Sequence, residues 1–201
     1  MYVLPNGQSR SGEKAVHIGV ASDDLALIAE PAIQLSIWQR VRPAGLSWID
    51  ALDWSEINDI DAHITGPDWG AEIWPGLREA GYPDTADGQV LKAELAQRAE
   101  AFARLMRSER LRMRLEVVET DACRRFHMDY LSARLLMPLF GPGTQWIDVA
   151  DGEDAPIQEL GAGDVAIFKG RLAVEDPMVL HRSPPVSQSG ATRLLLVLDP
   201  A

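Results

Sequence analysis

Short apolar segments separated by turn residues fill the second half of the chain, and this pattern constrains the fold more than any other feature. Apolar and charged side chains alternate over residues 111–117, which is the period of a half-buried strand. Further apolar segments follow, the first interrupted by Pro138, at residues 126–140, 146–149, 157–160, 165–168, 178–180 and 194–198. Strand-length segments at roughly 8–12-residue spacing are typical of a β-sandwich or barrel. Nothing between them is long enough for the helical crossovers of a parallel sheet.

We therefore predict an α+β fold that is mainly β, namely a double-stranded β-helix (jelly roll) with an N-terminal helical or mixed extension. The β-rich core is expected to span about residues 111–199. Residues 15–201 are expected to form a single jelly-roll domain with N-terminal support helices. Residues 1–14 are polar and are expected to be loosely ordered.

The extension contains the clearest helix of the chain. Apolar residues recur at helical spacing over residues 88–107, with Asp87 as the predicted N-cap, so we expect a long helix packed on the sheet. Alternation over residues 33–37 predicts a strand. Residues 46–83 are rich in Trp, Asp, Gly and Pro, and they predict short helices and loops whose Trp side chains pack in the core.

Composition excludes several classes of protein. The chain has 201 residues, a formal net charge of −11 and a single cysteine, Cys123. The negative charge argues against a nucleic-acid partner, because phosphate binding relies on Lys and Arg. One cysteine permits no intrachain disulfide, which fits a reducing compartment. With neither a signal-peptide pattern nor an apolar run of roughly 18 residues, we expect a cytoplasmic protein without membrane contact. The oligomeric state is left open.

The pair His127 and Asp129 is the strongest chemical signal. Side chains two residues apart on a strand share a face, so the imidazole and the carboxylate should point the same way. His181 follows at the end of the short predicted strand 178–180. Two histidines and one carboxylate on one side of a metal form the facial triad of non-haem Fe(II) sites. A His-x-acid pair arises by chance in about half of chains of this composition. The prediction therefore depends on placing all three residues at the mouth of the barrel.

Two arginines are candidates for binding a carboxylate co-substrate. Arg193 opens the last predicted strand and offers the planar, always-charged fork that suits a carboxylate. Arg134 is a charge within an apolar run, where it binds the cofactor, pairs with a protein carboxylate or reaches solvent. Cys123 lies four residues before His127, so a mixed zinc site stays open beside the commoner role of a small buried hydrophobe.

The order of these residues resembles the Fe(II)- and 2-oxoglutarate-dependent oxygenase superfamily, in which a His-x-Asp pair precedes a second His and then a basic residue. Residues 163–168 also resemble the core of that superfamily. The resemblance implies Fe(II) held by His127, Asp129 and His181, and 2-oxoglutarate bound by Arg193. It further implies a small-molecule or peptide substrate, which these residues do not identify.

A more specific resemblance covers about residues 30–199. The chain resembles a bacterial family catalogued as domain of unknown function 1826, through Trp146 and the segments 126–130, 134–136, 141–144, 163–170, 181–185 and 193–196. Members of that family are sometimes encoded near zinc-responsive genes and metallochaperone GTPases. This implies an alternative, a zinc-binding module linked to metal homeostasis without turnover. A jelly-roll isomerase or dioxygenase that uses no ketoacid is a third interpretation of the same triad.

Overall fold

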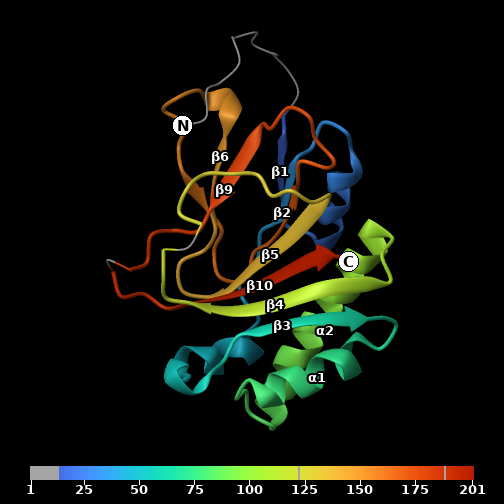
Figure 1. Cartoon of the computed structure of the whole chain (residues 1–201), viewed down its shortest axis with the longest axis vertical. Helices are drawn as coiled ribbons and strands as arrows, with labels where there is room; N and C mark the ends of the chain where they lie inside the picture. The colour runs from blue at the N-terminus through green and yellow to red at the C-terminus, as the bar shows by residue number, and fades with distance from the viewer. Residues whose placement is uncertain (1–13, 122, 188) are drawn as a thin grey trace.

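Two β-sheets pack against each other, and helices cover the outer face of the larger sheet (Figure 1). The computed structural model describes residues 14–121, 123–187 and 189–201, and the fold is mixed α/β and mostly sheet. The larger sheet has seven strands, in the order β1 (Val16–Gly19), β2 (Leu35–Trp38), β8 (Val165–Lys169), β5 (Ala133–Phe140), β10 (Arg193–Pro200), β4 (Arg110–Val118) and β3 (Ile60–Thr65). The smaller sheet has three, in the order β7 (Gln158–Glu159), β6 (Gln145–Asp148) and β9 (Val179–Arg182). The helices are α1 (Trp69–Glu79) and α2 (Ala86–Met106), with 3₁₀ turns η1 (Ser22–Ala29), η2 (Ala44–Ala51), η3 (Trp54–Glu56) and η4 (Val149–Asp151).

Strand β10 lies between β4 and β5 and is buried on both faces. Because side chains alternate along a strand, Leu194, Leu196 and Leu198 point to the helices, whereas Leu195 and Val197 point to the smaller sheet. The antiparallel ladder between β10 and β5 continues through Pro138, next to a register shift at Leu194 and Leu195. The expected break at Pro138 is therefore wrong, because a local irregularity accommodates the proline within the strand.

Helix α2 confirms the long helix expected over residues 88–107. Leu91, Leu95 and Phe102 form its buried stripe and pack with β10 in the main core. The N-cap residue is Thr85 and not Asp87, which lies inside the first turn and complements the helix dipole there. No helix in residues 14–121, 123–187 and 189–201 is long and apolar enough to cross a bilayer.

The smaller sheet covers the inner face of the larger one. Trp146 and Val179 pack in one core cluster with Leu136, Phe168 and Leu195 of the larger sheet. In Figure 1, β6 and β9 lie at the opposite end of the view from α1 and α2, so the two cores occupy different faces of the larger sheet.

Several expectations need correction. The segment that carries His127 and Asp129 is not a strand, because His127 makes one isolated bridge and Asp129 lies in an irregular stretch before β5. Residues 46–83 contain β3 and the 11-residue helix α1 in addition to short turns, since Asp68 caps α1 and the helix continues through Pro75. The sequence pattern does not predict β1. The expected loose order of residues 1–14 falls almost wholly on residues 1–13, which lie outside the described residues.

The core of β10 generates a stability prediction. Leu196 is fully buried, so Leu196→Ala should lower the free energy of unfolding by about 2–5 kcal/mol, through lost burial and a residual cavity. Leu172→Ala is the control, because Leu172 is 62% exposed and its loss should change stability by less than about 0.5 kcal/mol. Urea unfolding followed by circular dichroism measures both, and equal midpoints for the two variants would contradict the assignment of this core.

Candidate metal centre

Backbone pairing brings the two histidines together. His127 and His181 exchange both hydrogen bonds of an antiparallel bridge, since the N–H of each donates to the carbonyl of the other at 2.9 Å. Residues opposed in this way project their side chains to the same face. The two ring centroids are 4.7 Å apart. His181 lies within β9 and not at its end, so strand geometry fixes its position.

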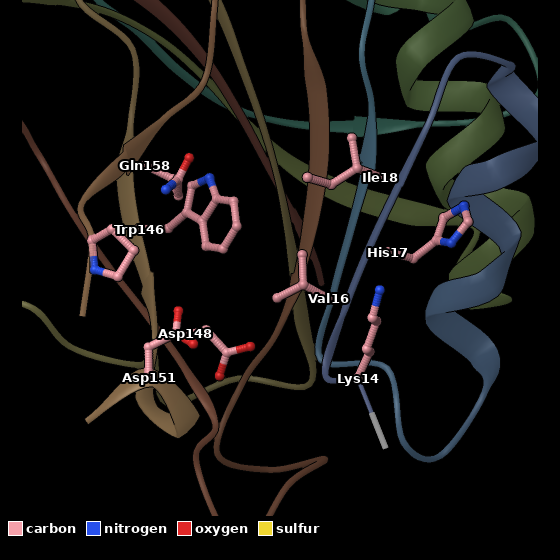
Figure 2. Close-up of a pocket in the computed structure, with 9 residues that line it drawn as sticks. Lys14, Val16, His17, Ile18, Trp146, Asp148, Asp151 and Gln158 are labelled. Atoms are coloured by element: carbon pink, nitrogen blue, oxygen red, sulfur yellow. The ribbon is translucent and has the colours of Figure 1, made fainter. Parts of the chain in front are cut away.

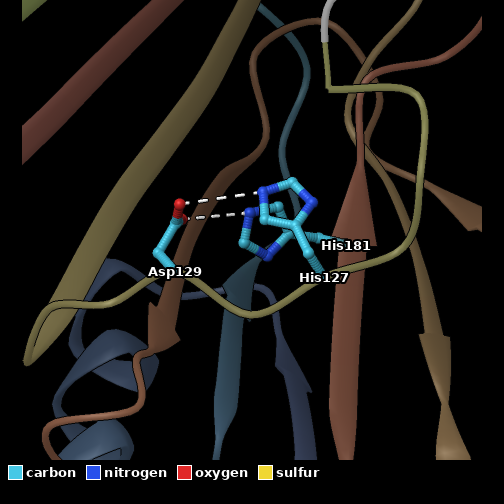
Figure 3. A group of neighbouring side chains, drawn as sticks. All are labelled: His127, Asp129 and His181. Carbon is cyan, nitrogen blue, oxygen red and sulfur yellow. Dashed lines mark ion pairs between the residues drawn. The ribbon is translucent and has the colours of Figure 1, made fainter. Parts of the chain in front are cut away.

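Asp129 completes the cluster although it is not on a strand. Its carboxylate faces both imidazoles (Figure 3), with Oδ1 3.7 Å from His127 Nε2 and Oδ2 3.1 Å from His181 Nε2. One ligand atom from each of the three residues lies within 4.8 Å of the others. The Asp129 carbonyl accepts a hydrogen bond from the N–H of Arg171 at 2.9 Å, which ties this irregular segment to the end of β8.

Arg134 anchors the Asp129 carboxylate. Its Nη1 atom lies 2.7 Å from Asp129 Oδ1, while its Nε and Nη2 atoms donate to Asp199 at 2.6 and 2.8 Å. Arg114 also donates to Asp199, at 3.2 Å. Asp199 stands opposite Arg134 at the far end of β10, so the larger sheet positions the Asp129 carboxylate through two ion pairs.

The electrostatic environment differs for the three cluster residues. Burial acts to raise the pKa of Asp129, but His127, His181 and Arg134 outweigh it and hold that pKa well below its usual range. The neighbouring Asp129 carboxylate raises the pKa of His127. Burial lowers the pKa of His181 despite the same carboxylate. The cluster therefore presents an ionised carboxylate beside one imidazole that holds a proton easily and one that does not.

The donor set fits a divalent transition metal. His127 Nδ1 lies 2.8 Å from the carbonyl of Arg125, an arrangement that favours a proton on Nδ1 and leaves the Nε2 lone pair for a metal. Asp129 Oδ2 is buried, and the 3.1 Å contact with His181 does not give it a well-aligned hydrogen bond. A buried carboxylate oxygen without such a bond calls for a partner. Two imidazoles and this oxygen can hold Fe(II) or Zn(II) on one face.

Arg193 is a buried cation that contacts Ser183, two residues after His181 in the chain. Its Nη1 atom donates to Ser183 Oγ at 2.8 Å and its Nη2 atom to Thr144 Oγ1 at 3.3 Å, while Nε has no partner. No carboxylate of the described residues forms an ion pair with it. Burial lowers the pKa of Arg193 to about 10, against the attraction of Glu116 and Glu159. The guanidinium therefore lies in an interior that contains hydroxyl groups but no paired anion.

Other sequence candidates lie elsewhere. Cys123 is exposed and does not belong to the described His and Asp cluster. His17 lies beside Asp24, at 3.4 Å, and His63 lies on β3. Sequence reasoning missed Asp199 as the partner of Arg134. The one available signal is an acidic residue at the end of an otherwise apolar strand, on the same face as Arg193.

The Asp199 anchor generates a prediction. Asp199→Asn should weaken metal binding by roughly 10–100-fold, because Arg134 loses its bidentate partner and no longer fixes Asp129. The matched control is Asp61→Asn, which removes an exposed carboxylate that is also bidentate to an arginine, Arg112, remote from the cluster. Calorimetric titration with Mn(II) measures both variants. Equal affinities for Asp199→Asn and wild type would show that the anchor has no influence on the cluster.

The two histidines generate a pH prediction. A metal binds neutral imidazoles, so protons compete with it and affinity falls as pH falls. The pKa of His127 is raised above its ordinary value of about 6.5 and that of His181 is lowered. Affinity should therefore start to fall at a pH above about 6.5 and decrease by about tenfold for each further pH unit, with the release of one proton and not two when the metal binds. Titrations in buffers of different ionisation enthalpy count the protons, and an affinity independent of pH from 7.5 to 5.5 would contradict the ligand assignment.

Solved structures similar to this chain include three oxygenase-type proteins. One is a dioxygenase for auxin oxidation from rice, with a TM-score of 0.48 and 13% identity over 83% of this chain and 73% of that chain. Another is a Pseudomonas putida prolyl-4-hydroxylase, with a TM-score of 0.48 and 13% identity over 89% of this chain and 97% of that chain. The third is the dioxygenase for auxin oxidation 1 from Arabidopsis thaliana in a binary complex with 2-oxoglutarate (TM-score 0.44, 11% identity, 71% and 61%). Scores below 0.5 at this identity assign no activity to this chain. No curated protein matches the sequence.

A comparison with family models gives a match over nearly the whole chain. The family described as "Protein of unknown function (DUF1826)" matches residues 20–199. The match includes both histidines and the aspartate of the cluster, together with Arg134, Arg193 and Asp199. It confirms the resemblance found in residues 30–199 of the sequence. The chain therefore belongs to the DUF1826 family.

Proposed function

We propose that the protein is a non-haem Fe(II)- and 2-oxoglutarate-dependent oxygenase. The observation that carries this proposal is a His127–Asp129–His181 cluster combined with Arg193, a buried guanidinium without a carboxylate partner among the described residues. Burying an unpaired cation is unfavourable, and a metal alone would not relieve it. An anionic ketoacid that reaches both the metal and Arg193 would satisfy the two groups together.

The strand order supports a jelly roll as the scaffold. The central strands β4, β10, β5 and β8 form one antiparallel four-stranded sheet. The bridge at His127 adds a fourth member to the smaller sheet. Its order is then the His127 segment, β9, β6 and β7, and all neighbours in it are antiparallel. Two such sheets packed face to face form a double-stranded β-helix. The cluster and Arg193 then lie between the sheets, where ligand sites of barrels concentrate.

The surroundings of Arg193 suit the distal carboxylate of 2-oxoglutarate. Ser183 lies two residues after His181, so its hydroxyl lies roughly 6–7 Å along the chain from the histidine. An extended five-carbon dicarboxylate is of comparable length. The guanidinium fork supplies charge and direction, and the hydroxyls of Ser183 and Thr144 hold the fork in place.

Charge balance favours a dianion over the metal alone. The charged groups around the cluster and Arg193 comprise three guanidinium groups and three carboxylates, which sum to zero: Arg114, Arg134, Arg193, Glu116, Asp129 and Asp199. A divalent metal would add two positive charges to this interior, and burial of uncompensated charge is unfavourable. A dicarboxylate dianion would restore neutrality.

The residues of the chain then have separate roles. When bound, Fe(II) and 2-oxoglutarate supply the chemistry by which O₂ oxidises a substrate C–H bond. His127, Asp129 and His181 hold the metal on one face. Arg134 uses three of its five N–H donors on Asp129 and Asp199, so two remain for the keto end of 2-oxoglutarate. Phe168, whose ring centroid lies 4.8 Å from that of His181, keeps water from one side.

The decisive experiment uses purified protein loaded with Fe(II) under anaerobic conditions. Addition of 2-oxoglutarate should produce a weak visible charge-transfer band, and His127→Ala and Asp129→Ala should abolish it. Succinate release is then measured across a panel of metabolites and peptides. Binding of iron without binding of 2-oxoglutarate would remove the main support for an oxygenase. Zinc binding without ketoacid binding would instead favour the zinc-binding module without turnover.

Arg193 generates the most selective prediction of this assignment. Arg193→Lys and Arg193→Ala should leave metal affinity within about twofold of wild type and weaken 2-oxoglutarate binding by about 1.5–3 kcal/mol, as for a lost charge-assisted hydrogen bond. Arg182→Ala is the control, because Arg182 follows His181 and, by alternation along β9, points to the other face. Loss of metal and ketoacid binding together would point to unfolding, which circular dichroism detects.

A further inference from the structure

A cavity of about 430 Å³ lies between the edge strand β1 and the segment from β6 to β7 (Figure 2). Val16 and Ile18 line it from the larger sheet, and Trp146 and Gln158 line it from the smaller sheet. Pro156 adds apolar surface from the connecting loop. A cavity of a few hundred Å³ with apolar walls and a few polar groups has the dimensions of a small-molecule site.

Opposite charges lie on the two sides of this cavity. Figure 2 shows Asp148 and Asp151 together on one side and Lys14 on the other, with Val16 between them. Asp148 Oδ1 accepts a hydrogen bond from the N–H of Ala150, at 2.9 Å. Within the described part of the chain, no ion pair joins Lys14, Asp148 or Asp151 to another charged group.

Histidine 17 also lines the cavity but does not change this charge pattern. Because side chains alternate along β1, His17 points to the opposite face from Val16 and Ile18. Its ring lies beside Asp24, with Nε2 3.4 Å from Oδ1. The charges that face the cavity are therefore one ammonium group and two carboxylates.

The cavity begins one residue pair from the metal centre. Trp146 is directly opposite His181 in the pairing of β6 with β9. Side chains opposed in this way have Cβ atoms about 4.5–5.5 Å apart. Thr144, two residues before Trp146, contacts Arg193, whereas Asp148 lies two residues after it. Along β6 the proposed ketoacid anchor, the metal centre and the cavity therefore follow one another in that order.

We propose that this cavity binds a small zwitterion of the α-amino-acid class and presents it to the metal centre, an inference that rests on the proposed oxygenase function. The ammonium group of the ligand lies against Asp148 and Asp151, and its carboxylate lies against Lys14. An apolar side chain packs on Val16, Ile18 and Trp146. An ammonium group near an indole ring and two carboxylates is stabilised by both charge and the π face.

Three probes with the same branched apolar group test the charge pattern. L-Leucine carries both charges, 3-methylbutylamine carries only the ammonium group and 4-methylpentanoate carries only the carboxylate. Titration of metal-free protein, followed by ligand NMR line broadening, should show leucine binding at least tenfold more tightly than either analogue. Equal affinity of leucine and the amine would overturn the zwitterion assignment. Failure of all three probes to bind would overturn the site.

Substitutions at exposed positions, and at the half-buried Asp148, test the residues that line the cavity. Asp148→Asn combined with Asp151→Asn should weaken leucine binding about tenfold. Lys14→Gln should weaken leucine binding and leave the amine unaffected. Glu153→Gln combined with Asp154→Asn is the matched control, because it removes the same charge from exposed positions of the same loop outside the cavity. Ile18→Trp fills the cavity from a half-exposed position and should abolish binding. If the control variant bound leucine as weakly as the Asp148 and Asp151 variant, the loss of affinity would come from the change in net charge, and the proposal would be overturned.

A paramagnetic metal separates this proposal from the proposed function. Mn(II) bound at the His127–Asp129–His181 cluster should shorten the relaxation times of leucine protons. A competing analogue should reverse this effect at an excess that matches the analogue's own affinity. Leucine binding without relaxation enhancement, in protein that binds Mn(II), would overturn the presentation of the ligand to the metal. Leucine binding in protein that binds no Mn(II) would instead refute the oxygenase assignment and leave the cavity as a ligand site.

Discussion

The interior of this protein depends on Arg134, which holds two carboxylates at once. It joins Asp129, from the irregular segment just before β5, to Asp199, which lies 65 residues further along the chain than Arg134, in the last strand. Without this guanidinium, the carboxylate would be buried beside two imidazoles with little positive charge to stabilise it, a situation that commonly costs several kcal/mol. The same contact occupies Asp129 Oδ1 and leaves Oδ2 facing His181. One ion pair therefore sets both the stability and the orientation of the cluster.

Strand alternation separates stability from chemistry within single strands. In β10, Leu194, Leu196 and Leu198 pack with the helices, and the opposite face carries Leu195 and Val197 between two charged ends. Those ends are Arg193 and Asp199, each of which contacts a part of the site. We expect a change on the helix side to alter the free energy of unfolding, and a change at either end of the inner face to alter what the candidate site binds. Arg193 and Asp199 are thus fixed by a strand that is buried along nearly its whole length.

The sequence predicts the regular parts of this arrangement and misses the long-range ones. Helix α2 and strands β4, β8 and β10 follow from periodicity, because each buries one face or both. The His127, Asp129 and His181 set follows from residue chemistry. The placement of Asp129 off the strand does not, since backbone bonds to a distant loop decide it. Asp199 and the hydroxyls around Arg193 are also missed, because their partners lie 10 to 65 residues away along the chain and local periodicity does not pair them. Helix α1 is missed because Pro75 lies inside it.

Arg134 and Arg193 show how geometry, and not residue type, separates two functions. Both are arginines on inner faces of the same sheet. Burial acts to lower the pKa of Arg134, but Asp199 and Asp129 outweigh it and raise that pKa. Burial lowers the pKa of Arg193 to about 10, because hydroxyl groups cannot replace a carboxylate as a counter-charge. An arginine whose charge is balanced by ion pairs with carboxylates serves to hold a protein carboxylate in place. An arginine that is buried, aligned by two hydroxyls and not paired with a carboxylate of the described residues is instead the group that we propose receives an anion from outside the chain.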